Sequence, residues 1–86
     1  MRIEKKIQPK FFQLILDGVK TYELRLADFD INPGDILVLK EFNPEYKQYT
    51  GRIIEKNVTY VCKVKDIDYW PKEDIEKFGF QIISFK

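Results

Sequence analysis

The 86-residue sequence contains no histidine and a single cysteine, Cys62. These absences exclude an internal disulfide, a zinc site built from cysteine and histidine, and any mechanism in which histidine activates a serine or cysteine nucleophile. A metal bound by carboxylates alone remains open. We nevertheless expect no cofactor and no resident metal.

A long apolar run and a clear excess of charge are also missing. No stretch reaches the ~18 apolar residues of a membrane-spanning helix, and Met1 leads into charged residues without an apolar run of signal length. We therefore expect a cytoplasmic protein with no membrane partner. Fifteen Lys and Arg face fourteen Asp and Glu, so nucleic-acid binding would require a local basic patch.

The composition is that of one small folded domain. Hydrophobic residues make up 44% of the chain and aromatic residues 15%, which is too much for a disordered protein. No internal repeat, low-complexity tract or Gly/Ser linker divides residues 1–86, and the length leaves no room for a second core. We predict a single domain of undetermined oligomeric state.

The N-terminal part of the sequence predicts a strand followed by a helix. Residues 2–7 are typical of a short strand. Pro9 suits the first turn of a helix, where its missing N–H would have no partner, and Gly18 closes that helix. Apolar residues at spacings of three and four within 11–16 are typical of a helix packed on a sheet.

The rest of the chain predicts mainly strands. Alternating or apolar runs predict them at residues 20–26, 36–39, from about 49, and at 58–65 and 80–85. Asn32-Pro33-Gly34-Asp35 has the composition of a tight turn, and the polar residues 43–48 predict a hairpin. Pro71 to Phe78 is typical of a short helix, with proline first and glycine after it.

These elements together predict the fold class. Short strands outnumber helices and cannot bury both faces as an open sheet in so few residues. We therefore predict a mainly β fold with α, a small and partly closed barrel of five to six strands with one packed helix and a second short helix.

The densest polar cluster lies at residues 18–25. Glu23 and Arg25 are two apart on a predicted strand, so their side chains point to one face from Cα atoms about 7 Å apart, and Lys20 lies at the strand mouth. Two cations and a carboxylate offer donors for phosphate or carbonyl groups and an acceptor for an exocyclic amine, which suits a nucleobase or nucleotide. The alternative is an ion pair on an exposed polar face.

The order Gly18, Lys20, Glu23, Arg25 resembles the G-x-K-x-x-E-x-R signature of the ASCH (activating signal cointegrator homology) domains, which belong to the PUA-like superfamily of small RNA-binding barrels. Over roughly residues 3–60, further positions resemble one uncharacterised prokaryotic and phage-associated branch: Pro9 with Phe12, Pro33-Gly34-Asp35 before Leu37 and Leu39, Glu41 with Phe42, and Tyr49-Thr50-Gly51-Arg52. The resemblance implies a β-barrel whose cleft opens between the helix exit and the strands.

The sequence departs from these relatives at two positions that bear on catalysis. Ile3 stands where members of the branch often have histidine, and Glu23 stands where amidohydrolase relatives acting on acetylated cytidine have threonine. Thr21 does not replace that threonine, because strand alternation puts it on the face opposite Lys20. The resemblance implies Lys20 for a phosphate or carbonyl, Glu23 for an amine or for orienting a neighbouring cation, and Arg25 for stacking or bidentate bonding.

We therefore expect a non-catalytic PUA-like module that binds RNA or a modified nucleotide in a cleft around Lys20, Glu23 and Arg25. One alternative is a small hydrolase acting on a nucleobase or on the RNA backbone, which the missing histidine and threonine oppose. Another is a protein-interaction domain, favoured by the near-neutral charge and by aromatic residues in loops.

Other side chains add further candidates. Arg52 is either a second ligand-binding cation in the cleft or a cross-strand partner of Glu41 or Glu55. Four rings at loops or element ends either stack on unpaired bases or cap the core: Tyr46, Tyr49, Tyr69 and Trp70. Lys5, Lys6 and Lys10 either extend a phosphate track or are solvated. Alternation within 58–65 places Cys62 inside, as an inert thiol.

Overall fold

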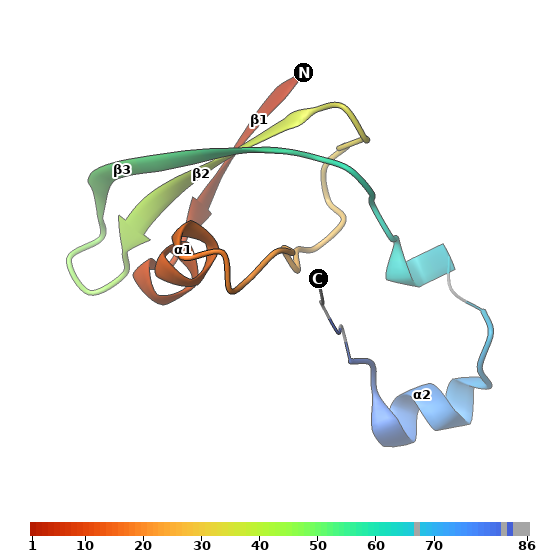
Figure 1. The fold of residues 1–86 in the computed structure, drawn as a ribbon. Coiled ribbons are helices and arrows are strands. Elements are labelled where there is room, and N and C mark those ends of the chain that lie inside the picture. The colour runs from red at the N-terminus through yellow and green to blue at the C-terminus, as the bar shows by residue number, and fades with distance from the viewer. Residues whose placement is uncertain (67, 82, 84–86) are drawn as a thin grey trace.

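A three-stranded sheet with one helix on its face forms the centre of the computed structural model, which describes residues 1–66, 68–81 and 83 (Figure 1). The strands are β1 (Arg2–Ile7), β2 (Ile36–Asn43) and β3 (Gln48–Asn57), in that order across the sheet. β1 pairs parallel to β2, and β2 pairs antiparallel to β3. The parallel pair requires a crossover connection, and α1 (Pro9–Leu16) with residues 17–35 supplies it.

The helix α1 begins and ends as its sequence predicts. Pro9 occupies its first turn, and Phe12 and Ile15 are its buried residues. At the end, Gly18 has φ 73°, and its N–H donates to the carbonyl of Ile15 while that of Val19 donates to Leu14. This left-handed turn satisfies carbonyls that the helix itself leaves without partners, and glycine adopts it without steric cost.

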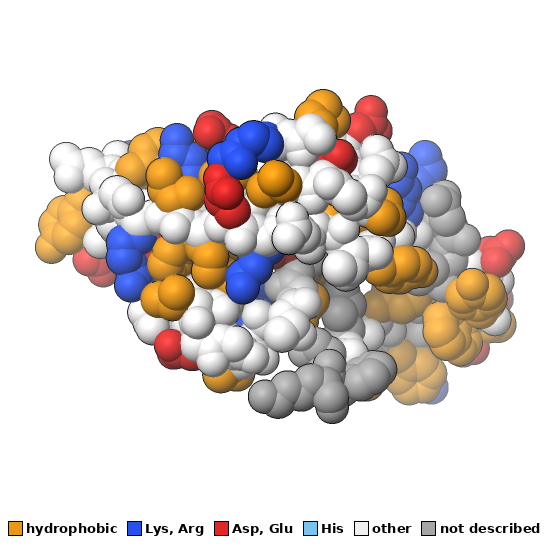
Figure 2. Space-filling model, turned by 45° about the horizontal axis from the view of Figure 1, so that its top comes forward, with side chains coloured by type: hydrophobic (Ala, Val, Ile, Leu, Met, Phe, Trp, Pro, Cys, Tyr) orange, Lys and Arg blue, Asp and Glu red, His pale blue; other side chains and the backbone are white. Residues whose placement is uncertain are grey.

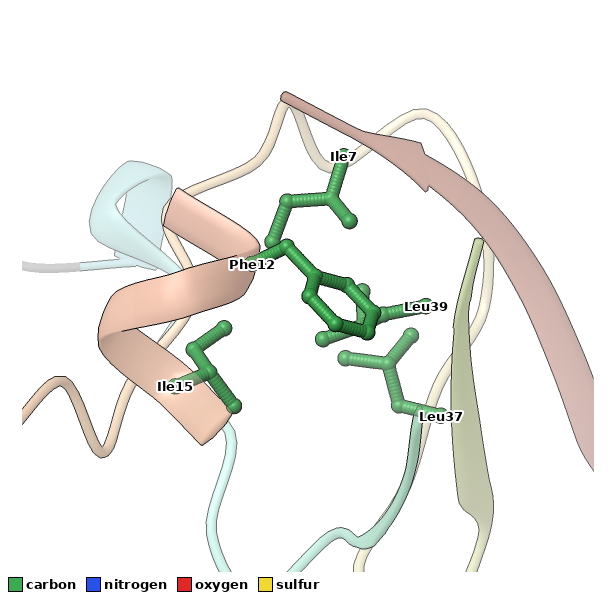
Figure 3. Packing of buried hydrophobic residues seen from close by; sticks show 5 residues of the cluster. All are labelled: Ile7, Phe12, Ile15, Leu37 and Leu39. Carbon is green, nitrogen blue, oxygen red and sulfur yellow. The ribbon is translucent and has the colours of Figure 1, made fainter. Parts of the chain in front are cut away.

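The core lies between α1 and the inner face of the sheet. It consists of Ile7, Phe12, Ile15, Leu37 and Leu39, whose side chains meet in Figure 3. Leu39, at 1% exposed, is the most deeply buried of them. Alternate residues of β2 supply the two leucines. Val38, between them, is also buried, at 3% exposed, but lies outside this cluster. The predicted strand at 2–7, the helix after Pro9 and the hairpin are thus confirmed.

The β2–β3 hairpin contains an irregularity that matters for the polar residues on it. Lys40 pairs with Ile53, but Phe42 pairs with Tyr49, so the register shifts between them. Glu41 therefore faces three residues, 50–52, and Gly51 has φ 94°. A bulge of this kind re-aims side chains, here so that two residues of β3 can approach Glu41.

Two of the predicted strands are wrong. Residues 20–26 and 58–63 have no strand structure, and Val64–Asp66 form a short 3-10 helix, η1. In place of strand pairing, residues 20–26 make side-chain hydrogen bonds to backbone carbonyls. Lys20 Nζ donates to the Tyr22 carbonyl, and Arg25 donates to the Lys6 carbonyl in β1.

The partly closed barrel of five to six strands expected from the sequence is not formed by the described residues, which make a small mixed α/β protein. Of the predicted last strand at 80–85, residues 80, 81 and 83 have no strand structure, and the others lie outside the described residues. The turn at 32–35 is confirmed, because the Asp35 N–H donates to the Asn32 carbonyl at 3.0 Å.

The second predicted helix is confirmed as α2 (Lys72–Phe78), which follows Pro71 and precedes Gly79. It has no buried residue and lies apart from the sheet and α1 (Figure 1). Neither described helix has the length and apolar character that crossing a membrane requires.

Candidate functional site

A cavity of about 380 Å³ opens beside the core. Ile15, Leu37 and Leu39 form its apolar floor. Its walls come from residues within 18–31 and, within 56–63, from the end of β3 and the irregular segment after it. The volume lies within the range of small-ligand sites, which are typically apolar with a few placed polar groups.

Lys20, Glu23 and Arg25 all line this cavity and form one ionic cluster. Lys20 Nζ lies 2.7 Å from Glu23 Oε1, and Arg25 Nε lies 2.8 Å from Glu23 Oε2. The Lys20 and Glu23 side chains are only 12% and 15% exposed, whereas Arg25 is 30% exposed. The three residues that the sequence singled out are therefore brought together, although their segment is not a strand.

The backbone and nearby rings hold the two cations in place. Lys20 Nζ donates to the Tyr22 carbonyl at 2.7 Å and lies 4.6 Å from the centre of the Tyr22 ring. Arg25 is attached to the β1 carbonyl of Lys6. These contacts fix the cluster to the edge of the sheet, because β1 has a described strand partner only on its β2 side.

The geometry gives Glu23 a positioning role. Both of its oxygens accept hydrogen bonds from the cluster, one from Lys20 and one from Arg25. Arg25 has five N–H donors and Lys20 has three, and within the described residues each uses two of them. Donors therefore remain for a phosphate, carboxylate or carbonyl oxygen, with Arg25 the more exposed of the two.

Sequence reasoning missed two further cations of the cavity, Lys56 and Lys63. Lys56 is near the end of β3, and Lys63 belongs to a segment wrongly predicted as a strand. Only the path of residues 56–63 past the cavity brings them near residues 20–25, and no local pattern signals that path. Strand alternation predicted Thr21 and Lys20 on opposite faces, but both residues line the cavity.

Cys62 requires a correction. It is exposed and lines the cavity, whereas strand alternation placed it in the interior. The alternation rule fails here because residues 58–63 have no strand structure.

Arg52 is not among the residues that line the cavity. Its guanidinium donates from Nε to Glu41 Oε1 and from a terminal nitrogen to Oε2, both at 3.0 Å. Thr50 donates to Oε1 at 2.6 Å. Of the two roles considered for Arg52, the structure shows the cross-strand partner of Glu41. Glu55, the other candidate partner, instead accepts from Arg2.

The electrostatics of this second cluster follow from its hydrogen bonds. Glu41 is 5% exposed, and donation from Arg52 and then Thr50 lowers the pKa of its carboxyl. The same hydrogen bond raises the pKa of Arg52, which remains a cation. Arg52 also lies 4.5 Å over the Phe12 ring and donates to Gln13, so the cluster ties the hairpin to α1.

The remaining candidates are spread over the surface. The four tyrosine and tryptophan rings are all more than half exposed: Tyr46, Tyr49, Tyr69 and Trp70. Lys5, Lys6 and Lys10 each lie over a ring, those of Phe29, Phe42 and Phe11 respectively. Figure 2 shows such cations interspersed with hydrophobic side chains on one face. Among the described residues, no group of three or more Cys, Asp or Glu is arranged to hold a metal ion.

Comparison with known proteins identifies relatives of the chain. Residues 4–74 match the family described as "Domain of unknown function (DUF3850)". A curated relative from Escherichia phage P2, described as "Uncharacterized 12.9 kDa protein in GpA 3'region", is 36% identical over 63 residues. That alignment covers 73% of this chain and 56% of the relative, so the chain spans little more than half of the relative's length. No solved structure matches the chain.

Proposed function

The chain belongs to the family described as a domain of unknown function (DUF3850), so we propose a function from the geometry itself. We propose a non-catalytic module that binds RNA or a modified nucleotide in the cavity beside Lys20, Glu23 and Arg25. The convergence of these three side chains on an apolar cavity carries the proposal. An apolar floor suits the face of a base, and the remaining donors of Arg25 suit a phosphate or base carbonyl.

The charge of the cavity supports an anionic ligand. Among the described residues, four cations line it, Lys20, Arg25, Lys56 and Lys63, and Glu23 is the single carboxylate. This local excess contrasts with the whole chain, whose net charge is +1. Binding of a long RNA should therefore weaken as salt rises, because each phosphate contact releases counterions.

Affiliation with the ASCH branch of the PUA-like superfamily is part of the proposal. The signature residues Gly18, Lys20, Glu23 and Arg25 support it, because they end the helix and form the ionic cluster. A closed barrel of five to six strands would require pairing beyond the three described strands. A solved structure of a ligand complex tests that finer assignment.

The binding experiment follows backbone amides by NMR while single-stranded RNA, duplex RNA, free nucleosides and nucleoside monophosphates are added at two salt concentrations. We expect shifts within residues 18–26 and 56–63. Arg25→Ala should weaken binding about tenfold, the equivalent of one hydrogen bond to a charged group. Arg2→Ala is the matched control, because Arg2 also pairs with a glutamate but is not among the cavity residues.

Three outcomes decide the proposal. Shifts confined to the cavity residues and lost in Arg25→Ala support it. An absence of shifts with every ligand contradicts it and favours a protein-interaction domain. Turnover of a nucleoside or RNA that Glu23→Gln abolishes in a folded protein assigns the cavity to a hydrolase instead.

A further inference from the structure

The segment of residues 68–80, here called the arm, exposes an unusual amount of aromatic surface. Tyr69 and Phe78 are 78% and 74% exposed, and Trp70 is 55% exposed. Trp70 contacts Tyr69 and Phe80 edge to face, with ring centres 5.7 and 6.2 Å apart. Hydrophobic side chains accordingly crowd the end of the molecule where Figure 1 places α2 (Figure 2). An apolar patch of this kind on a small protein marks a contact surface.

The arm and the cavity have opposite charge. The arm contains four carboxylates, Asp68, Glu73, Asp74 and Glu76, against the two lysines Lys72 and Lys77. Within the part of the chain that the structure describes, the cavity lining contains four cations against one carboxylate. The arm thus has aromatic rings that can pack on the apolar floor of the cavity and carboxylates that can pair with the cations of its lining. Such complementarity selects partners and their orientation.

The structure keeps the arm away from its own cavity. Lys63 is the last of the described residues that line the cavity, and η1 follows directly and leads the chain away from the sheet (Figure 1). No residue of α2 is buried. The Cα radius of gyration is 14.8 Å, against about 12 Å for a compact chain of this length. An extended arm is the element that two copies of a chain can exchange.

From this combination we propose that the arm of one copy docks into the cavity of a second copy, with Trp70 as the apolar anchor and the α2 carboxylates beside Lys56 and Lys63. The exchange is reciprocal in a two-fold dimer, because each copy contributes one arm and one cavity. If the cavity also binds RNA or a nucleotide as proposed above, the arm excludes it, since carboxylates and rings occupy the places of phosphates and bases.

Charge reversal on each side of the contact tests the proposal with the full-length chain. The arm variant is Glu73→Lys with Asp74→Lys, and the cavity variant is Lys56→Glu with Lys63→Glu. Sedimentation velocity measures association over a concentration series, and the emission of Trp70, the single tryptophan, reports its burial. Circular dichroism establishes that each variant is folded.

We expect the wild type to dimerise with a blue shift of Trp70 emission, and each variant alone to dimerise at least about tenfold more weakly at low salt. A mixture of the two variants should regain dimerisation, because each arm then meets a cavity of opposite charge. A merely structural effect of the substitutions would not be rescued by mixing. A monomeric wild type, a dimer that neither reversal weakens, or Trp70 burial that does not depend on concentration overturns the proposal.

The same samples separate this inference from the proposed function. RNA or nucleotide binding by a protein that stays monomeric supports the function and overturns the arm contact. Dimerisation that RNA does not displace supports the arm contact and contradicts a shared cavity.

Discussion

Arg52 binds both carboxylate oxygens of Glu41 through two parallel hydrogen bonds of 3.0 Å, at the point where the β2–β3 register shifts. The carboxylate is 5% exposed, so burying it without these donors would be costly. The bulge makes this pairing geometrically possible, because it lets both Thr50 and Arg52 of β3 approach Glu41 of β2. The pair therefore organises the part of the hairpin next to its turn and the contact of the hairpin with α1.

Glu41→Ala should lower the free energy of unfolding by about 2 kcal/mol, because it removes a buried acceptor and leaves two donors without their partner. Urea denaturation followed by circular dichroism measures the change. Glu45→Ala is the matched control, since Glu45 is an exposed glutamate of the same hairpin, and its effect should stay within about 0.5 kcal/mol. Equal losses in the two variants would contradict the role assigned to Glu41.

Acid should destabilise the wild type more than Glu41→Gln. The Glu41 pKa is lowered in the folded state, so its contribution is present above the ordinary glutamate pKa of about 4.3 and is lost as the pH falls through the lower folded value. Unfolding free energies measured between pH 7 and pH 3 should therefore converge for the two proteins. A difference that stays constant down to pH 3 would show that the carboxylate charge contributes nothing.

Gly51→Ala should destabilise the protein by about 1 kcal/mol, because φ 94° is a conformation that side chains rarely adopt. No heavy atom lies within 4 Å of the position that a Cβ would take, so the cost is conformational rather than steric crowding by neighbours. Chemical denaturation gives the magnitude. The expected accompanying change is a shift of the Arg52 side-chain NMR signals, and an unchanged stability would argue against the positive φ.

Leu39→Ala should cost about 2–5 kcal/mol, the range for truncating a fully buried leucine. Leu24→Ala provides the comparison, because Leu24 is 67% exposed and should change stability by about 0.5 kcal/mol or less. The midpoint of urea unfolding is the readout. A small effect at Leu39 would mean that α1 does not cover the inner face of the sheet in solution.

Cys62 should react with a thiol reagent in the native protein at a rate close to that in the urea-unfolded protein, because its side chain is exposed. Absorbance after addition of an aromatic disulfide reagent follows the reaction. Strong protection of the native thiol, relieved by urea, would instead support the interior position that strand alternation predicted.

The site illustrates what local pattern can and cannot predict. The sequence predicts that Lys20, Glu23 and Arg25 meet, but from a strand that residues 20–26 do not form, and their ionic contacts arise in an irregular segment. The sequence does not predict Lys56 and Lys63 as cavity residues, because they reach the cavity only through the path of a segment distant in sequence from residues 20–25. The sequence leaves two roles open for Arg52, a cation in the cleft or a cross-strand partner of Glu41 or Glu55, and only the tertiary structure shows the pairing with Glu41.

The sequence by itself determined the elements that local chemistry controls. Proline at the start of α1, glycine after it and the turn at 32–35 each have a cause within a few residues. Only the tertiary structure decided which alternating segments became strands. A strand needs a neighbouring backbone to pair with. In residues 20–26, Arg25 instead donates through its side chain to the Lys6 carbonyl, and in residues 58–63, Val58 makes its backbone hydrogen bonds with the turn at Gly34 and Asp35.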